Sequence, residues 1–479
     1  MATAATTVNR LAGRLRGELL TPGDPGYSAV RKPVIGTARE VLPQAVVRCA
    51  GVEDVVEAIG YARSCGLRFA LRSGGHSFAE HSSTEGLLID LGGMCSVTVG
   101  RDLVTVEPGV RIGQLTDRLA AEDRMVPCGW SRSVGVTGAA LGGGFGVFSR
   151  LYGLGCDHLA AAQVVLADGR VVWTDADREP DLYWALRGAG GGNFGAVTSL
   201  VFRTGPVVAA MRFELHFGHR DAAVVADAWQ HWAPDLDPEV NAELAVVAGD
   251  DPATPPILVV FGVAVADRGS TEAFLQRFVA RVGAEPLAVS LAAMSGRDAA
   301  RHHVDPEWEP SPMPPDARPG LRVVRSQFFD RPSPARAVAD LVAWFGSPSR
   351  RVAGQIRELE FVPWGGAFAR VAPQATAFPH RGARFLLRHT VQVGARASDQ
   401  ARWTARQWVT GSWAILRPYG SGGAYVNYPD PELPAWTRAY YGPNLERLIE
   451  VKAKYDPTGL FRSPQAIPLT RIGSAGTEA

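Results

Sequence analysis

The chain has 479 residues, of which 46% are hydrophobic and 20% are charged, and its formal net charge is +1. This length predicts two or three domains, and the composition is typical of a globular protein. A net charge so close to zero gives no electrostatic basis for binding nucleic acid or an anionic membrane. No apolar run approaches the roughly 20 residues that span a bilayer, and segment 1–20 lacks the apolar core of a secretory leader. We expect that segment to be an amphipathic helix of a cytoplasmic protein.

The first 205 residues alternate strand-like and helix-like segments that are dense in glycine. Residues 51–66 carry apolar side chains at helical spacing and end on Gly66, which predicts a helix followed by a glycine cap. The other elements expected here are strands at 67–75 and 86–91, a helix at 111–124, and hairpins at 96–110 and 161–175, the latter turning on Asp168-Gly169.

From about 206 to 420 glycine becomes rarer, and longer strand and helix patterns alternate, as at 257–265 and 270–283. These patterns predict an antiparallel sheet backed by helices. A proline-rich stretch at 305–320 is expected to be a surface loop. The tail at 447–461 has helical spacing and then a Pro-Thr-Gly stop.

The cysteines and histidines predict neither a disulfide framework nor a metal site. The five cysteines are odd in number and show no CxxC spacing, so buried free thiols are expected. The pair His302-His303 has no companion residues at metal-ligand spacing.

Three glycine clusters lie at 72–76 ("RSGGH"), 134–146 and 187–195. Glycine lets backbone N–H groups approach an anion closely, and successive N–H groups form nests for phosphate. Three such clusters between strand-like segments favour a large phosphate-bearing cofactor. A P-loop motif is absent, and no strand leads into "GGGFG" as a dinucleotide-binding βαβ unit requires. His76, directly behind Gly74-Gly75, is open to four interpretations: a turn residue, a metal ligand, a general base or a covalent anchor.

An ordered series of motifs resembles the berberine bridge enzyme-like branch of FAD-linked oxidases, in the vanillyl-alcohol oxidase (PCMH-type) superfamily. The motifs are "RSGGHS", "GWSRSVGVTGAALGGGFG", "DLYWALRGAGGGNFGAVT", "AFPHR" and "YVNYPD…YYGPNLERLIEVKAKYDPTGLFR". The resemblance implies an α+β fold: a two-subdomain, PCMH-type FAD-binding domain from 1–205, completed by 421–479, with a substrate-binding domain at 206–420.

The resemblance also implies residue roles. His76 would be bonded to the 8α-methyl carbon of the flavin, and Asn427 of "YVN" would reach the flavin from the C-terminal segment. The residues implied to cradle the pyrophosphate are Arg72, Ser73, Gly74, Gly75 and Ser77, and those implied to line the FAD are Val136, Gly138, Gly142, Gly143, Gly146, Asn193, Phe194, Gly195 and Val197.

Three positions depart from the pattern of many relatives. Ser131 occupies the place of a cysteine that forms a second covalent link, and serine cannot form that thioether. We therefore expect attachment through His76 alone, with no cysteinyl link. Ala139 replaces a histidine, and Phe145 replaces a tyrosine.

Flavin oxidation needs a base that takes a proton while hydride leaves the substrate carbon. Period-two alternation places Glu358 and Glu360 on one strand face, and Leu387, His389 and Val391 on another. We predict Tyr425 as the base, assisted by Glu360 or His389, with Tyr428 as a further candidate. The alternative is that Glu358 and Glu360 form a solvated strand face.

These features predict an FAD-dependent oxidase with a flavin attached to one histidine. It would take hydride from an alcohol, amine or phenolic natural product and pass electrons to O2, giving H2O2. A bacterial tailoring step in secondary metabolism, such as antibiotic biosynthesis, is the expected setting, and the protein would be a monomer or homodimer. The alternatives are a monooxygenase or oxidative cyclase acting on a polyketide, and a flavoprotein without turnover.

Overall fold

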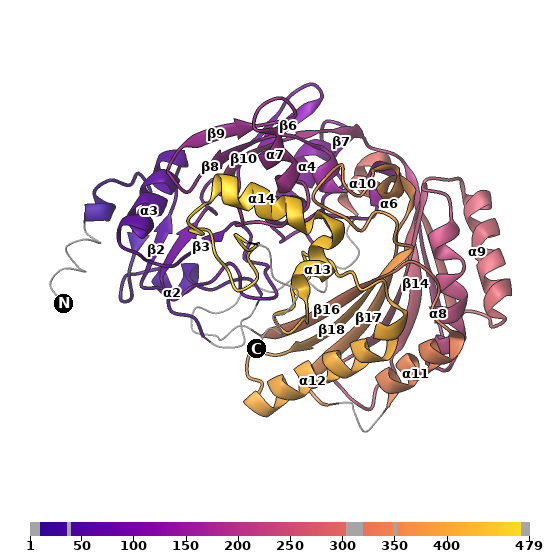
Figure 1. Cartoon of the computed structure of the whole chain (residues 1–479). Helices are drawn as coiled ribbons and strands as arrows, with labels where there is room; N and C mark the ends of the chain where they lie inside the picture. Colours follow the sequence, from indigo (N-terminus) through magenta and orange to yellow (C-terminus); the bar gives the residue numbers. More distant parts are fainter. Residues whose placement is uncertain (1–9, 36–39, 303–319, 348–351, 471–479) are drawn as a thin grey trace.

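The computed structural model describes residues 10–35, 40–302, 320–347 and 352–470. Its strands form three main sheets (Figure 1). The proline-rich stretch expected as a loop lies outside the described residues, apart from Gly320. In the described part of the chain, no helix combines the length and apolar character needed to cross a membrane.

The first sheet has four strands in the order β1 (Glu18–Leu20), β2 (Ala45–Arg48), β4 (Leu87–Asp90) and β3 (Phe69–Arg72). Strands β2 and β3 run parallel to β4, whereas β1 is antiparallel to β2. The expected helix is α3 (Val52–Ser64), followed by Gly66 in the left-handed region at φ +63°. The helix expected over 1–20 is wrong at its C-terminal end, because Glu18–Leu20 pairs with β2; residues 1–9 lie outside the described part.

The second sheet is antiparallel, in the order β5 (Val97–Val99), β6 (Leu103–Val106), β10 (Ala196–Arg203), β8 (Leu159–Val165) and β9 (Val171–Thr174). Both predicted hairpins are present. One face of this sheet packs on helices α4 (Ile112–Ala120), α5 (Val136–Leu141) and α7 (Pro180–Leu186). Short elements nearby are β7 (Arg124–Met125), β11 (Gly205–Pro206), α2 (Tyr27–Val30) and α6 (Ser149–Tyr152).

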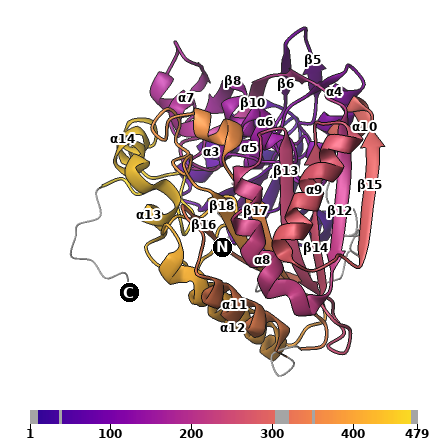
Figure 2. The same ribbon diagram turned by 90° about the vertical axis from the view of Figure 1, so that its right-hand side faces the viewer.

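The third sheet has seven antiparallel strands, in the order β15 (Ala288–Met294), β12 (Ala210–Phe217), β14 (Ile257–Ala264), β13 (Val240–Ala248), β17 (Gln355–Pro363), β18 (Phe385–Val393) and β16 (Leu321–Phe329). Helices α8 (Ala222–Gln230), α9 (Arg268–Val282), α11 (Ala335–Gly346) and α12 (Asp399–Leu416) cover one face (Figures 1 and 2). Helix α10 (Gly296–Arg301) follows β15. The predicted helix-backed antiparallel sheet is confirmed.

The C-terminal segment returns to the N-terminal half, where α13 (Trp436–Tyr441) and α14 (Leu445–Tyr455) share a hydrophobic cluster with α7 (Figure 1). Lys452 of α14 is buried and fastens this segment. Its Nζ donates to the carbonyl oxygens of Asn193 (2.5 Å) and Phe461 (2.6 Å) and pairs with Asp456 (2.7 Å). The third glycine cluster is thus held by residues more than 250 positions later in the chain.

Candidate active site

The first two glycine clusters touch each other. A Cβ added at Gly74 would collide with the backbone of Gly135, so the two loops approach closely only because both residues are glycine. The Arg111 guanidinium joins them, since its Nη1 donates to the carbonyl oxygens of Gly74 (2.6 Å) and Ser133 (2.5 Å). A positive charge therefore lies where two glycine-rich loops meet.

His76 follows β3 on the first of these loops. Its Nε2 is hydrogen-bonded to Ser133 Oγ at 2.9 Å, and Ser133 Oγ lies 3.1 Å from Ser131 Oγ. Burial, with the charges of Arg111 and Arg322 acting in the same direction, lowers the pKa of His76 to about 3. The imidazole is therefore neutral at physiological pH and keeps a lone pair on one ring nitrogen.

The C-terminal segment contacts the third glycine cluster and the C-terminal part of the second glycine cluster. Asn193 Oδ1 accepts a hydrogen bond from the backbone N–H of Ile467 (3.1 Å). Asn427 Nδ2 donates to Ala139 O (2.8 Å), and a Cβ at Gly142 would overlap the Asn427 amide. Asn427 and Asn193 thus hold the glycine loops against the returning chain.

Other residues predicted to bind the cofactor stabilise the glycine loops by hydrogen bonds to backbone groups. Arg72 is buried and donates to the carbonyl oxygens of Val30 (2.8 Å) and Ser82 (2.9 and 3.0 Å). Ser73 Oγ donates to Pro108 O (2.5 Å), and Ser77 Oγ accepts from the backbone of His81 (3.1 Å). The first two glycine clusters also contain Gly75, Gly138, Gly143 and Gly146. The remaining predicted residues are buried: Val136, Phe194, Gly195 and Val197. Of these, Phe194 and Val197 lie in the core around α7.

This arrangement fits the FAD that the motifs imply. A Cβ at Gly138 would meet open space, and Thr137 Oγ1 beside it is buried without a hydrogen-bond partner in the described part of the chain. Glycine-rich loops with a nearby arginine suit a diphosphate, because backbone N–H groups and a guanidinium both donate to phosphate oxygens. The residues that would hold the cofactor are those of the three glycine clusters with Arg111 and Asn427.

An ion-pair cluster lies on the face of the seven-stranded sheet that α8, α9, α11 and α12 leave uncovered. Arg388 Nη2 is 2.7 Å from Glu360 and 3.0 Å from Glu358. The side chains of Glu358 and Glu360 are only 11% and 9% exposed, so the alternative of a solvated strand face is wrong. Glu243 is fully buried, and burial together with Glu360 raises its pKa well above the usual value.

The two tyrosines of "YVNY" differ in their surroundings. Tyr425 Oη accepts hydrogen bonds from the backbone N–H of Gly144 and from Asn427 Nδ2, both at 2.9 Å. These bonds favour a phenolate, but burial outweighs them and raises the pKa of Tyr425. Burial also raises the pKa of Tyr428, although the Arg388 guanidinium, 5.4 Å from its ring centre, acts in the opposite direction. Both side chains are therefore phenols at neutral pH.

His389 lies on the opposite face of the sheet. The alternation of β18 directs it toward the helices, where its Nδ1 is hydrogen-bonded to Ser412 Oγ of α12 at 2.8 Å. Its neighbours Leu387 and Val391 share the helix-facing core, as their predicted common face requires. The structure does not bring His389 to Tyr425, which corrects the expectation that it assists that residue.

Aromatic rings pack together around Tyr425 and Tyr428. Phe145, at the position of the family's tyrosine, has its ring centre 5.3 Å from that of Tyr425, 5.4 Å from Trp364 and 5.7 Å from Trp130. Phe78, two residues after His76, meets Tyr428 edge to face at 5.9 Å. Phe145, Trp364 and Tyr425 are buried in one hydrophobic cluster, against which Trp130 and Tyr428 pack.

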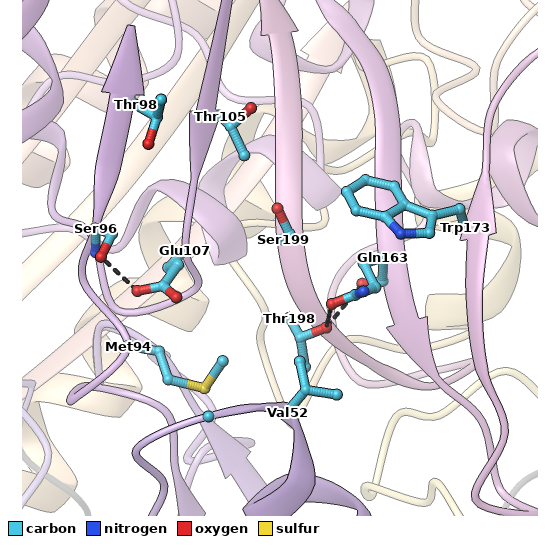
Figure 3. Close-up of a pocket in the computed structure, with 11 residues that line it drawn as sticks. Val52, Met94, Ser96, Thr98, Thr105, Glu107, Gln163, Trp173, Thr198 and Ser199 are labelled. Atoms are coloured by element: carbon cyan, nitrogen blue, oxygen red, sulfur yellow. Dashed lines mark hydrogen bonds between the residues drawn. The ribbon is translucent and has the colours of Figure 1, made fainter.

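A separate pocket of about 300 Å³ lies on the second sheet, beside the start of α3 (Figure 3). Thr98, Thr105, Gln163 and Trp173 line it from neighbouring strands. Hydroxyl and amide side chains on the uncovered face of an antiparallel sheet are typical of a solvated surface. None of the predicted site residues is among its lining residues, and we assign it no role in the site.

Sequence reasoning missed several residues of this site. Arg111 and Ser133 gave no signal by composition, although Ser133 lies inside the motif "GWSRSVGV". Arg388 reaches Glu360 because the two residues are directly paired between β17 and β18. Glu243 comes from a third strand, β13, more than 100 residues earlier in the chain.

The comparisons with known proteins agree with the geometry. Residues 43–175 match the model of an FAD binding domain, and residues 424–468 match the berberine and berberine-like model. An uncharacterized FAD-linked oxidoreductase, YgaK of Bacillus subtilis, is 30% identical over 96% of this chain and 98% of its own length. Chitooligosaccharide oxidase of Gibberella zeae is 28% identical over 89% of this chain and 87% of its own.

Solved structures show the same architecture. Physcomitrella patens BBE-like 1 superposes with a TM-score of 0.84 at 25% identity, covering 97% of this chain and 100% of that one. A chitooligosaccharide oxidase gives a TM-score of 0.85 at 25% identity, with the same coverage. The α+β, PCMH-type fold is therefore confirmed. The chain belongs to the berberine bridge enzyme-like family and is an FAD-linked oxidase related to the carbohydrate oxidases.

Proposed function

We propose that this oxidase carries its FAD on His76 alone and oxidises a hydroxyl group on a ring-shaped small molecule. The observation that carries the proposal is the position of a neutral, half-buried imidazole on the glycine loops, with the Arg388–Glu360 pair on the uncovered sheet face. Ser131 beside Ser133 supports a single link, because a hydroxyl at that position offers no thiolate.

We propose Glu360 rather than Tyr425 as the acceptor of the substrate proton. Bound FAD supplies a two-electron acceptor that can be reoxidised by O2. Arg388 fixes the Glu360 carboxylate, and Tyr428 beside that arginine orients the substrate hydroxyl. Tyr425, protonated and bonded to Gly144, holds the glycine loop in place. A phenol with a raised pKa must lose its proton before it can act as a base, whereas a neighbouring guanidinium favours the ionised form of a carboxyl group.

The substrate class follows from the walls of the site. Aromatic rings favour a flat or ring-shaped partner, and the charged cluster favours a hydroxyl group that can donate to a carboxylate. Sugars, phenolic alcohols and related natural products meet both requirements. The relationship to a chitooligosaccharide oxidase supports testing sugars first. A role in bacterial natural-product tailoring is also part of this proposal.

We propose that different segments of the chain bind the cofactor and the substrate. Segments 1–205 and 421–479 would form the cofactor-binding unit, and 206–420 the substrate-binding unit. One large hydrophobic cluster joins residues 104–202 chiefly with 424–467, whereas another is built from residues 213–416. Packing within each cluster supports the predicted boundaries.

The test measures acid-precipitated protein by absorbance and intact mass. Wild type is expected to stay yellow and to carry the mass of one FAD, whereas His76→Ala is expected to be colourless after precipitation. H2O2 release is then measured with a panel of oligosaccharides and phenolic alcohols, comparing wild type with Glu360→Gln. Flavin that stays acid-stable in His76→Ala overturns the attachment, and full turnover by Glu360→Gln overturns the base.

A further inference from the structure

A chain of hydrogen bonds runs away from His76 through two serines. His76 Nε2 bonds to Ser133 Oγ at 2.9 Å, and Ser133 Oγ lies 3.1 Å from Ser131 Oγ. Ser133 is fixed at its backbone by Arg111, which donates to its carbonyl oxygen (2.5 Å) and to that of Gly74 (2.6 Å). Ser131 and Ser133 are both half-buried, so the chain leads from the ring nitrogen along a loop that solvent can reach.

The hydrogen bond to Ser133 links the tautomer of His76 to the identity of its reacting nitrogen. A neutral imidazole carries one N–H, and the nitrogen that is hydrogen-bonded to a hydroxyl oxygen can hold it while the other keeps its lone pair. In the tautomer whose Nε2–H is donated to Ser133, Nδ1 is the nitrogen with the free lone pair. Nδ1 is then the nucleophile.

We propose that Ser133 and Ser131 are positioning residues that prepare His76 Nδ1 for covalent attachment and carry away the Nε2 proton. The inference rests on the proposed attachment at His76. In the reaction, Nδ1 forms a bond to the 8α carbon of the flavin, and that carbon loses one hydrogen as a proton. Nε2 loses its proton along Ser133 and Ser131. The two electrons released pass through the flavin to O2, which takes up two protons and leaves as H2O2.

Ser131 thus has a proposed role in proton transfer at the position where relatives carry a cysteine. In place of a second link, its hydroxyl extends the proton path from the first. Arg111 contributes a further constraint, since its positive charge beside the loops favours loss of a proton from the ring rather than protonation of it.

The test uses full-length protein produced in a riboflavin-starved host and then mixed with FAD. Acid-stable flavin and intact mass are followed with time, and non-covalent FAD binding is measured separately by quenching of flavin fluorescence. Ser133→Ala is expected to bind FAD as wild type does but to attach it more slowly, by roughly 100-fold if the hydroxyl acts in proton transfer. Ser131→Ala is expected to slow attachment by a smaller factor.

Matched variants separate positioning from general damage. Ser133→Thr keeps the hydroxyl and is expected to restore the rate, and Ser64→Ala on the exposed side of α3 is expected to match wild type. NMR of the proteolysed flavin peptide is expected to show the link at Nδ1. Attachment by Ser133→Ala at the wild-type rate, or a link at Nε2, overturns the inference alone. Wild type without acid-stable flavin overturns the proposed function and the inference together.

Discussion

The two sides of the candidate site are built from different materials. The cofactor side is mostly backbone: Gly74 meets Gly135, and Gly142 makes room for the Asn427 amide. The proposed substrate side is made of side chains on a sheet, with Arg388 between Glu358 and Glu360. An added methyl group should disrupt the cofactor side, whereas the loss of a charged side chain should disrupt the substrate side. The two sides should therefore fail in different ways.

The largest effect is expected from adding a single methyl group to the cofactor side. In Gly142→Ala the new Cβ overlaps Asn427, so that residue must leave its bond with Ala139. We expect the purified protein to lack bound FAD, measured by its visible flavin absorbance. Gly60→Ala in α3 is the control, because a Cβ there meets nothing within 4 Å and alanine favours helix. Normal flavin content in Gly142→Ala would contradict the conclusion that the cofactor side depends on close backbone packing.

Removing the central charge of the substrate side comes next. Arg388→Leu leaves Glu358 and Glu360 without their common partner, which is expected to cost about 3 to 5 kcal/mol in free energy of unfolding at pH 7. FAD content should be retained. Denaturant unfolding compares this variant with Arg406→Leu, whose exposed pair with Glu432 should contribute about 1 kcal/mol or less. Equal losses in the two variants would remove the distinction between the buried and exposed pairs.

Tyr425 lies between the two sides and should show a mixed effect. Tyr425→Phe leaves the Gly144 N–H and the Asn427 amide without their acceptor, which is expected to cost about 2 kcal/mol. If Tyr425 holds the loop and Glu360 accepts the proton, H2O2 release should fall moderately, with an unchanged pH profile. A shifted pH optimum for kcat in this variant would return the role of base to Tyr425.

At pH 7 the smallest titration effect is expected at His389, on the helix-facing side of the sheet, because its contribution depends on acidic pH. Burial lowers its pKa to about 3, whereas an unfolded histidine titrates near about 6.5. Between these values the unfolded chain binds a proton that the folded protein does not, so stability falls as the pH decreases from about 6.5 toward about 3. His389→Gln should make the decline in melting temperature over this acidic range shallower. Exposed His219→Gln is the control, and an identical slope in all three proteins would contradict the expectation.

The same contrast explains how much the sequence could predict. Glycine clusters are conspicuous in a sequence, and the family resemblance of the motifs around them implied roles for His76, Gly74 and Gly142, as the "YVN" motif did for Asn427. The sheet and its helices followed from local periodicity. The Arg388–Glu360 pair could not be predicted, because it depends on the register between β17 and β18. Strand alternation correctly gave His389 the same face as Leu387, but which face meets the cofactor is set by tertiary packing.

Lys452 has a consequence for how the protein is made. This buried lysine and Ile467 hold Asn193, so the third glycine loop obtains part of its hydrogen bonding from a segment more than 250 residues later in the chain. A chain that ends before Lys452 therefore lacks the hydrogen bonds that this lysine and Ile467 make to Asn193. Flavin loading should require the segment that contains Lys452, and chains shortened before it should remain colourless. An acid-stable yellow colour would then report that synthesis had reached the C-terminal segment.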